Sequence, residues 1–123
     1  MDYQKSQLIS ITTLKNRADF LRLRQGHKFT SAYFILRYGR ADVPLEGGAR
    51  VGYTVTTKCG NAVVRNRMKR RLRALVKELF PAAAKPETDY IFIAMAGVTP
   101  SLADAPYDDV RQAMKVALIK GGR

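Results

Sequence analysis

The stretch that decides the fold is CGNAVVRNRMKRRLRALVKELF, residues 59–80, which places six Lys or Arg side chains in the nine positions from Arg65 to Arg73. Its apolar residues recur every three or four positions and fall within an arc of roughly 80° on a helical wheel. These residues are Val64, Met68, Leu72, Leu75 and Leu79. The pattern predicts an amphipathic helix over 61–79 that packs its apolar stripe on a sheet. Arg65 and Arg71 flank the stripe, and the remaining surface is cationic.

The charges of this helix lack the acidic partners that a merely solvated helix face normally has. The first acid in the stretch is Glu78. Arg65 with Lys69, and Lys69 with Arg73, are like-charge pairs at four-residue spacing, which mildly destabilise a helix. Phosphates would neutralise them, and each contact would release counterions. Arginine suits phosphate because its planar fork makes two-point contacts. The helix is therefore predicted to bind nucleic acid.

Three alternatives to RNA stay open for this helix: a solvated face, a DNA-reading helix and a membrane-surface helix. No helix-turn-helix pattern precedes it, which disfavours DNA. A membrane-surface helix would need an exposed apolar stripe, but the stripe of this helix is assigned to the core. RNA is favoured because two neighbouring strands offer a polar platform with an aromatic on it. The platform residues are Tyr33, Arg37, Thr54, Thr56 and Lys58. We expect an RNA partner, no DNA and no membrane.

The chain as a whole is strongly basic and small. Its 123 residues carry a formal net charge of +12, and residues 50–80 alone hold 9 basic groups and 1 acidic group. The length suits one domain with one core, so we expect a single RNA-binding domain over 1–123. A single cysteine, no signal-peptide pattern and no long apolar run indicate a cytoplasmic protein.

Residues 16–26, NRADFLRLRQG, predict a short helix before the first strand. Asn16 can cap it, Asp19 stands at the third helical position as in a capping box, and Gly26 ends it. Residues 1–12 show no strong period and are expected to be extended or flexible.

Three strands and a last helix complete the predicted fold. Residues 28–40 and 50–58 alternate as half-buried strands, and 90–96 form the apolar run of a buried strand. A last helix begins near Asp104 and ends at Gly121. The predicted order is α-β-β-α-β-α in an α+β domain, and the strands on either side of the basic helix are expected to be parallel. On the first strand, one predicted face holds Phe34, Leu36 and Tyr38, and the opposite face holds Tyr33, Ile35 and Arg37.

The sequence supplies no catalytic constellation. His27 is the one histidine and Cys59 the one cysteine, so neither a two-histidine acid–base pair nor a Cys/His metal site can be built. Two-metal nuclease chemistry needs clustered carboxylates, and residues 47–77 contain none. We expect no catalytic residue and no metal held by the polypeptide alone.

Residues 50–73, RVGYTVTTKCGNAVVRNRMKRRLR, closely resemble the signature of the bacterial ribonuclease P protein subunit. LKNRADFLRLRQG and DYIFIAMAG resemble that family's first helix and later strand. The resemblance implies a subunit of a ribonucleoprotein endoribonuclease that removes the 5′ leader from precursor tRNA. In that family the RNA subunit and its magnesium ions perform catalysis, so magnesium is expected to be bound mainly by the RNA and the substrate. The family also implies a left-handed crossover through the basic helix, a rare exception among such connections.

The resemblance implies two binding surfaces. The surface for the catalytic RNA comprises Asn61, Arg65, Asn66, Arg67, Lys69, Arg70, Arg71 and Arg73. The surface for the single-stranded leader comprises Phe20, Tyr33, Arg37, Thr54, Thr56 and Lys58. Arg24 and Arg37 stand where several relatives have aromatics, so leader contact is expected to depend more on charge here. A non-enzymatic RNA-binding module and a protein-only nuclease are the competing hypotheses.

Overall fold

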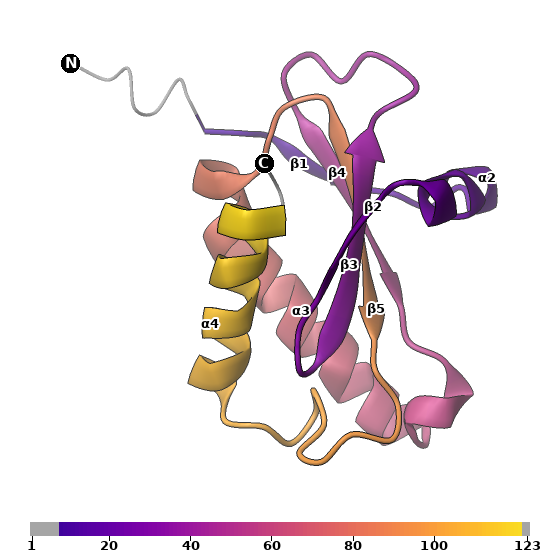
Figure 1. Ribbon diagram of the computed structural model, residues 1–123, viewed down its shortest axis with the longest axis vertical. Helices are drawn as coiled ribbons and strands as arrows, with labels where there is room; N and C mark the ends of the chain where they lie inside the picture. Colours follow the sequence, from indigo (N-terminus) through magenta and orange to yellow (C-terminus); the bar gives the residue numbers. More distant parts are fainter. Residues whose placement is uncertain (1–7, 122–123) are drawn as a thin grey trace.

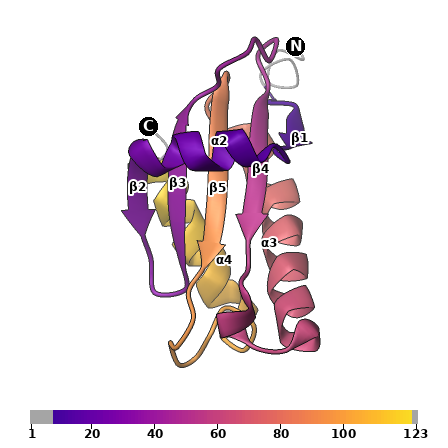
Figure 2. The ribbon, with the colours of Figure 1, turned by 90° about the vertical axis from the view of Figure 1, so that its right-hand side faces the viewer.

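The protein, described over residues 8–121 by a computed structural model, is built on one five-stranded mixed sheet with helices on both faces (Figure 1). The strand order is β1-β4-β5-β3-β2. The strands are β1 (Ile11–Thr13), β2 (His27–Thr30), β3 (Phe34–Arg40), β4 (Ala49–Thr54) and β5 (Thr88–Ala94). Helices α3 (Ala62–Ala83) and α4 (Tyr107–Val116) cover one face, and the short helix α2 (Arg17–Arg22) crosses the other (Figure 2).

The main core lies between the sheet and the two longer helices. Three residues of the predicted stripe are fully buried there, namely Met68, Leu72 and Leu75. Val64 and Leu79 lie at the edges of the stripe and are only partly buried. Val76 and Phe80 complete it, and the Phe80 ring packs edge-on against Tyr90 of β5 with the ring centroids 5.0 Å apart. The helical period therefore predicted the buried side of α3 correctly.

The predicted strand–helix–strand unit is confirmed as β4, α3 and β5. β4 and β5 pair in parallel, with Val51 beside Tyr90 and Tyr53 beside Phe92. In Figure 2 both strands point the same way and α3 lies behind the sheet. The left-handed sense of this crossover stays a prediction from the family resemblance.

The single strand predicted over 28–40 is in fact a hairpin. β2 and β3 are antiparallel, and Ser31 turns the chain between them. Its hydroxyl accepts hydrogen bonds from the backbone N–H groups of Tyr33 and Phe34 at 3.1 and 3.0 Å. A serine hydroxyl that accepts hydrogen bonds from nearby backbone N–H groups is common in such turns. Phe34 and Leu36, predicted to share one face of the strand, are both fully buried.

The C-terminal end of the predicted leader belongs to a strand, β1. Residues 1–7 lie outside the described part of the chain, but β1 pairs in parallel with β4. The backbone N–H of Ile9 also donates to the carbonyl of Pro81 at 2.6 Å, at the end of α3. With β1 and β2 added, the order over 8–121 is β-α-β-β-β-α-β-α rather than α-β-β-α-β-α.

The strand predicted over 50–58 ends at Thr54. A turn of 3₁₀ helix (Thr57–Cys59) follows, and Gly60, at a φ of 141°, leads into α3 in a conformation that favours glycine. At its other end α3 continues past the predicted limit of 79 and through Pro81 to Ala83. Proline is tolerated there in spite of its missing N–H, because the buried Phe80 and Ala84 hold that end of the chain against the core.

The last helix begins at Tyr107 rather than near Asp104. Val110 and Met114 form its buried stripe, and a π-helical turn (Ala117–Gly121) ends it at the predicted residue. Within residues 8–121, no helix is both long enough and apolar enough to cross a membrane.

Two glycines allow α2 to approach the opposite face of the sheet closely. Gly39 on β3 is paired with Asp89 of β5, and Gly52 on β4 is paired with Ile91. A Cβ atom on Gly39 would lie 3.1 Å from a methyl of Leu23. The side chains from the α2 segment thus occupy the space that these glycines leave. Phe20 packs at the edge of the small second core, which consists of Leu14, Leu23 and Ile91.

We predict that Gly52→Ala lowers the free energy of unfolding by about 1–3 kcal/mol, the usual cost of overpacking. The added Cβ would lie 2.6 Å from Cζ of Phe20 and 3.1 Å from the carbonyl oxygen of Leu14. Urea denaturation measures the change. In a Phe20→Ala background the same substitution should cost less, because the two residues interact directly. An unchanged cost in that background would show that Phe20 is not the obstacle.

Candidate RNA-binding surfaces

Five of the predicted RNA-binding residues form one polar surface on the outer side of α3, here called the α3 basic face. They are Asn66, Arg67, Lys69, Arg70 and Arg73. Arg67 lies 3.5 Å from Asp104, but both side chains are about half exposed or more, so this pair contributes little. Within residues 8–121, Lys69, Arg70 and Arg73 make no ion pair. Their charge is therefore available to an anionic partner.

Asn61 and Arg65 serve the start of α3 itself. The side-chain oxygen of Asn61 accepts a hydrogen bond from the backbone N–H of Val64 at 3.0 Å, as expected of an N-cap residue. Nε of Arg65 donates to the carbonyl of Gly60 at 3.1 Å. Both residues fix the turn that joins β4 to the helix, whether or not they also contact RNA.

Arg71 holds the connection between β5 and α4 against α3. Its Nη1 donates to the carbonyls of Ala105 and Leu102 at 2.6 and 3.3 Å. Its guanidinium also lies over the ring of Tyr107, 5.7 Å from the centroid. This side chain is half-buried and already has partners, so the structure places Arg71 outside the α3 basic face.

Arg73 lies at the other edge of α3, above β4. Its guanidinium is 5.7 Å from the centroid of the Tyr53 ring. Burial raises the pKa of the Tyr53 hydroxyl to about 12, although the charge of Arg73 opposes the shift, so this hydroxyl stays protonated near neutral pH. Arg73 and Lys77 also line a shallow groove of about 330 Å³ beside β1. The cationic surface thus continues from α3 toward this edge of the sheet.

On the opposite face of the sheet lies a larger groove of about 670 Å³, here called the α2 groove. It runs between the α2 segment and the strands β3, β4 and β5. Its lining residues are Arg17, Phe20, Leu21, Arg24, Arg37, Thr54, Ile91 and Ile93. Half of the lining comes from residues 17–24 and half from the sheet, so the groove depends on how α2 is placed.

The lining combines positive charge with an apolar floor. Arg17, Arg24 and Arg37 make no ion pair within the described part of the chain, and no acid lines the groove. Nη1 of Arg37 donates to the carbonyl of Arg24 at 3.2 Å, which holds its side chain across one end. Phe20 and Ile91 present apolar surface below. Cationic groups beside flat apolar surface suit the phosphates and bases of single-stranded RNA.

Three of the six predicted leader residues line this groove: Phe20, Arg37 and Thr54. The other three lie elsewhere. Tyr33 is in the hairpin turn and packs against the main core, so its predicted place on the opposite face of the strand is wrong. Thr56 and Lys58 follow the end of β4 and are exposed outside the groove lining.

Arg17 and Leu21 also line the groove, although neither was among the predicted leader-binding residues. With Phe20 and Arg24 they occupy positions i, i+3, i+4 and i+7, which share one face of a helix. This helical spacing is the sequence signal for both residues, whereas the predicted leader surface consists mainly of strand residues.

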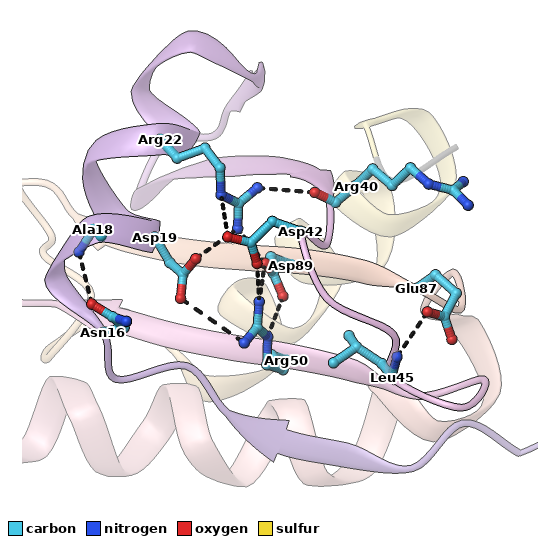
Figure 3. Close-up of polar contacts among 10 residues, drawn as sticks. All are labelled: Asn16, Ala18, Asp19, Arg22, Arg40, Asp42, Leu45, Arg50, Glu87 and Asp89. Atoms are coloured by element: carbon cyan, nitrogen blue, oxygen red, sulfur yellow. Dashed lines mark hydrogen bonds and ion pairs between the residues drawn. The ribbon is translucent and has the colours of Figure 1, made fainter.

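A cluster of charged residues lies beside the groove, under α2 (Figure 3). We call it the α2 ion-pair cluster, and its members are Asp19, Arg22, Asp42, Arg50 and Asp89. Residues far apart in sequence meet here, so three carboxylates cluster in the fold although residues 47–77 contain none. Asp19 accepts a hydrogen bond from Nη2 of Arg22 at 3.0 Å, a role different from the predicted capping box.

The three carboxylates of this cluster do not fit a magnesium site. One oxygen from each lies within 4.8 Å of the others, a spacing that could suggest a cation. The guanidinium groups of Arg22 and Arg50 occupy the space between them and bind all three. Two fixed positive charges at the centre of the cluster disfavour a third.

Comparison with known proteins identifies the family of this chain. A family model described as ribonuclease P matches residues 10–121. The chain belongs to the ribonuclease P protein family. This family is the protein component of the ribonucleoprotein endoribonuclease that processes the 5′ end of tRNA. The ribonuclease P protein component of Ruegeria pomeroyi is 35% identical over 106 residues, which cover 85% of each chain. That of Gluconacetobacter diazotrophicus is 37% identical over 110 residues, covering 88% of this chain and 92% of the relative.

Solved structures share the fold. The ribonuclease P protein of Thermotoga maritima superposes with a TM-score of 0.73 at 22% identity, covering 86% of this chain and 94% of that one. A Staphylococcus aureus ribonuclease P protein gives 0.72 at 24% identity, covering 90% and 97%. The α+β architecture predicted from the sequence is therefore confirmed.

Arg71→Ala should destabilise this ribonuclease P protein by about 1–3 kcal/mol, because two backbone carbonyls would lose a charged donor. Arg70→Ala, a neighbouring change on the exposed surface, should alter the free energy of unfolding by less than about 0.5 kcal/mol. Guanidinium titrations of the two variants give the comparison. Equal effects would contradict the separation of Arg71 from the α3 basic face.

Acid should destabilise the fold through Asp42 and Glu87. Burial alone would raise the pKa of Asp42, but the charge of Arg22 and a hydrogen bond from Arg50 lower it below the ordinary 3.8. Hydrogen bonds from the backbone N–H groups of Leu45 and Gly47 lower the pKa of Glu87 below the ordinary 4.5. Both carboxylates are thus easier to protonate in the unfolded chain. Their stabilisation is complete above these ordinary values and is lost as pH falls through the lower folded-state pKa values.

The expected result is a thermal midpoint that begins to fall near pH 4.5 and a shallower fall in Glu87→Gln, which lacks one of the two groups. Circular dichroism melts between about pH 3 and 7 would measure both. Glu46→Gln, which removes a nearby exposed carboxylate, is the matched control and should keep the wild-type pH dependence. Parallel curves for wild type and Glu87→Gln would contradict the assignment.

Proposed function

We propose that this chain binds the catalytic RNA of ribonuclease P through the α3 basic face and holds the 5′ leader of precursor tRNA in the α2 groove. The observation that carries the proposal is the α2 groove, in which three arginines without acidic partners border an apolar floor. The two surfaces lie on opposite faces of the sheet (Figure 2). One molecule can therefore contact both RNAs at once.

In this mechanism the polypeptide positions the substrate and provides no attacking group. Arg17, Arg24 and Arg37 bind leader phosphates, and a base packs on Phe20. On the other face, the unpaired cations of α3 bind phosphates of the RNA subunit. Bringing the two RNAs together lowers the entropic cost of the productive arrangement. Magnesium, bound mainly by the RNA subunit and the substrate, supplies the metal chemistry of cleavage.

The cytoplasm is the proposed location, because precursor tRNA and the RNA subunit are both made there in bacteria. No DNA partner and no membrane partner are proposed. The unpaired arginines and the apolar floor of the α2 groove suit single-stranded RNA, and the apolar stripe of α3 is buried in the core.

The test is reconstitution with a bacterial ribonuclease P RNA. The purified protein alone should leave precursor tRNA intact. Addition of the RNA should give cleavage at the mature 5′ end at a low magnesium concentration, at which that RNA alone is slow. If the protein fails to help the RNA at any magnesium concentration, the proposal is wrong.

Leader length separates this function from a general RNA-binding module. Precursors with leaders of several nucleotides should bind the reconstituted enzyme more tightly than precursors with a single-nucleotide leader. A general RNA-binding module would bind both equally well. Cleavage that survives complete removal of RNA would instead favour a protein-only nuclease.

A further inference from the structure

The α2 groove needs something to hold α2 in place. Helix α2 has six residues, and isolated helices shorter than about 12 residues are marginal in water. Arg17, Phe20 and Leu21 of the groove lining stand on this helix, and Arg24 stands on the 3₁₀ turn that follows it. Contacts between α2 and the sheet therefore set the width and charge spacing of the groove.

Asp89 is the fixed point of these contacts. It lies on the central strand β5, and its side chain is completely buried. Arg50, its direct neighbour on β4, donates Nε and Nη2 to its two oxygens at 2.7 Å each. Such a two-point pair is geometrically strict. The carboxylate and one guanidinium are thus fixed to the sheet before α2 is considered.

Arg22 connects α2 to this fixed pair. Its Nη2 donates to Asp89 at 2.5 Å and to Asp19 of the same helix at 3.0 Å. Its Nη1 donates to the carbonyl of Arg40 at the end of β3 at 2.9 Å, and Nε lies 3.6 Å from Asp42. One side chain therefore joins the helix to two strands and to the following loop (Figure 3).

The geometry around the cluster favours one placement of α2. Gly39 lies beside Asp89 on β3 and leaves space for Leu23, and Gly52 leaves space for Phe20. The helix thus rests on two apolar contacts with Arg22 directed inward between them. Loss of Arg22 would leave the buried Asp89 with one partner and the cluster with two uncompensated negative charges, which is costly in a buried location.

We propose that the α2 ion-pair cluster is a positioning device for leader binding: it fixes α2 over the sheet and so sets the spacing between the arginines on the two sides of the groove. This inference rests on the proposed leader-binding function. Arg22 is a positioning residue. It acts through Phe20 and Arg24, which line the groove, and its own guanidinium is occupied by the cluster.

The experiment uses the enzyme reconstituted with a bacterial ribonuclease P RNA and two precursor tRNAs, one with a long leader and one with a single-nucleotide leader. Arg22→Ala should weaken binding of the long-leader precursor about tenfold and of the short-leader precursor less than about twofold. The loss should be in KM, with kcat unchanged, because an interaction that only holds substrate is removed. Affinity for the RNA subunit should stay the same.

Arg40→Ala is the matched control, because it removes an exposed positive charge nearby and keeps the backbone carbonyl that Arg22 uses. It should bind both precursors like the wild type. Arg22→Lys should bind the long-leader precursor almost as weakly as Arg22→Ala, since one ammonium cannot reproduce the contacts of a guanidinium. Hydrogen exchange supplies a second readout: amides of residues 17–25 should exchange faster in Arg22→Ala, while those of α3 keep their protection.

The outcomes separate this inference from the function on which it rests. If the wild-type enzyme does not distinguish the two leaders, leader binding itself is wrong. If the wild type distinguishes them and Phe20→Ala loses that distinction, but a folded Arg22→Ala keeps it, only the positioning role is wrong. Should Arg22→Ala fail to fold, Asp42→Asn decides the matter, because Asp42 is exposed and contacts both arginines. Wild-type leader dependence in Asp42→Asn with unchanged exchange of α2 would overturn the proposal.

Discussion

The packing of the apolar stripe of α3 against the sheet is the contact on which the rest of this structure depends. Met68, Leu72 and Leu75 are fully buried, and each contributes about 1.5–3 kcal/mol through the removal of apolar surface from water. Because a helix can bury only one side in this way, the rotation of α3 about its axis is fixed. The cationic side chains on the other side must therefore face solvent or an RNA partner, in spite of their mutual repulsion.

The two faces of the sheet are stabilised by different interactions. The α3 and α4 side is a large apolar core, in which the aromatic rings of β5 pack against Phe80. The α2 side has a small core and a charged cluster, and it stays open beside them as a groove. A thick helix layer on both faces would have left no open sheet surface. The short α2, held by a few specific contacts, leaves that surface accessible.

The sequence predicted the parts of the fold that depend on a local period. The buried stripe of α3 and the parallel pairing around the helix were both accessible from residue spacing and element order. The hairpin at Ser31 was not predicted, because aromatic and branched residues on both sides gave the pattern of one strand. The turn depends on the hydroxyl of Ser31 and has no Gly or Pro to mark it. The α2 ion-pair cluster could not be predicted, since Asp19, Asp42 and Asp89 come together only when the sheet has formed. Periodicity carries no information about such distant partners.

Arg71, Arg65 and Asn61 belong to the most recognisable part of the sequence, yet each is hydrogen-bonded within its own chain. The basic motif therefore encodes two things at once, a helix joined correctly to its neighbours and a charged surface. Transferred alone to another protein, the same sequence would present a different set of cations, because the carbonyls of Leu102 and Ala105 that occupy Arg71 would be absent. The charged surface that the motif presents is a property of the folded domain rather than of a portable peptide.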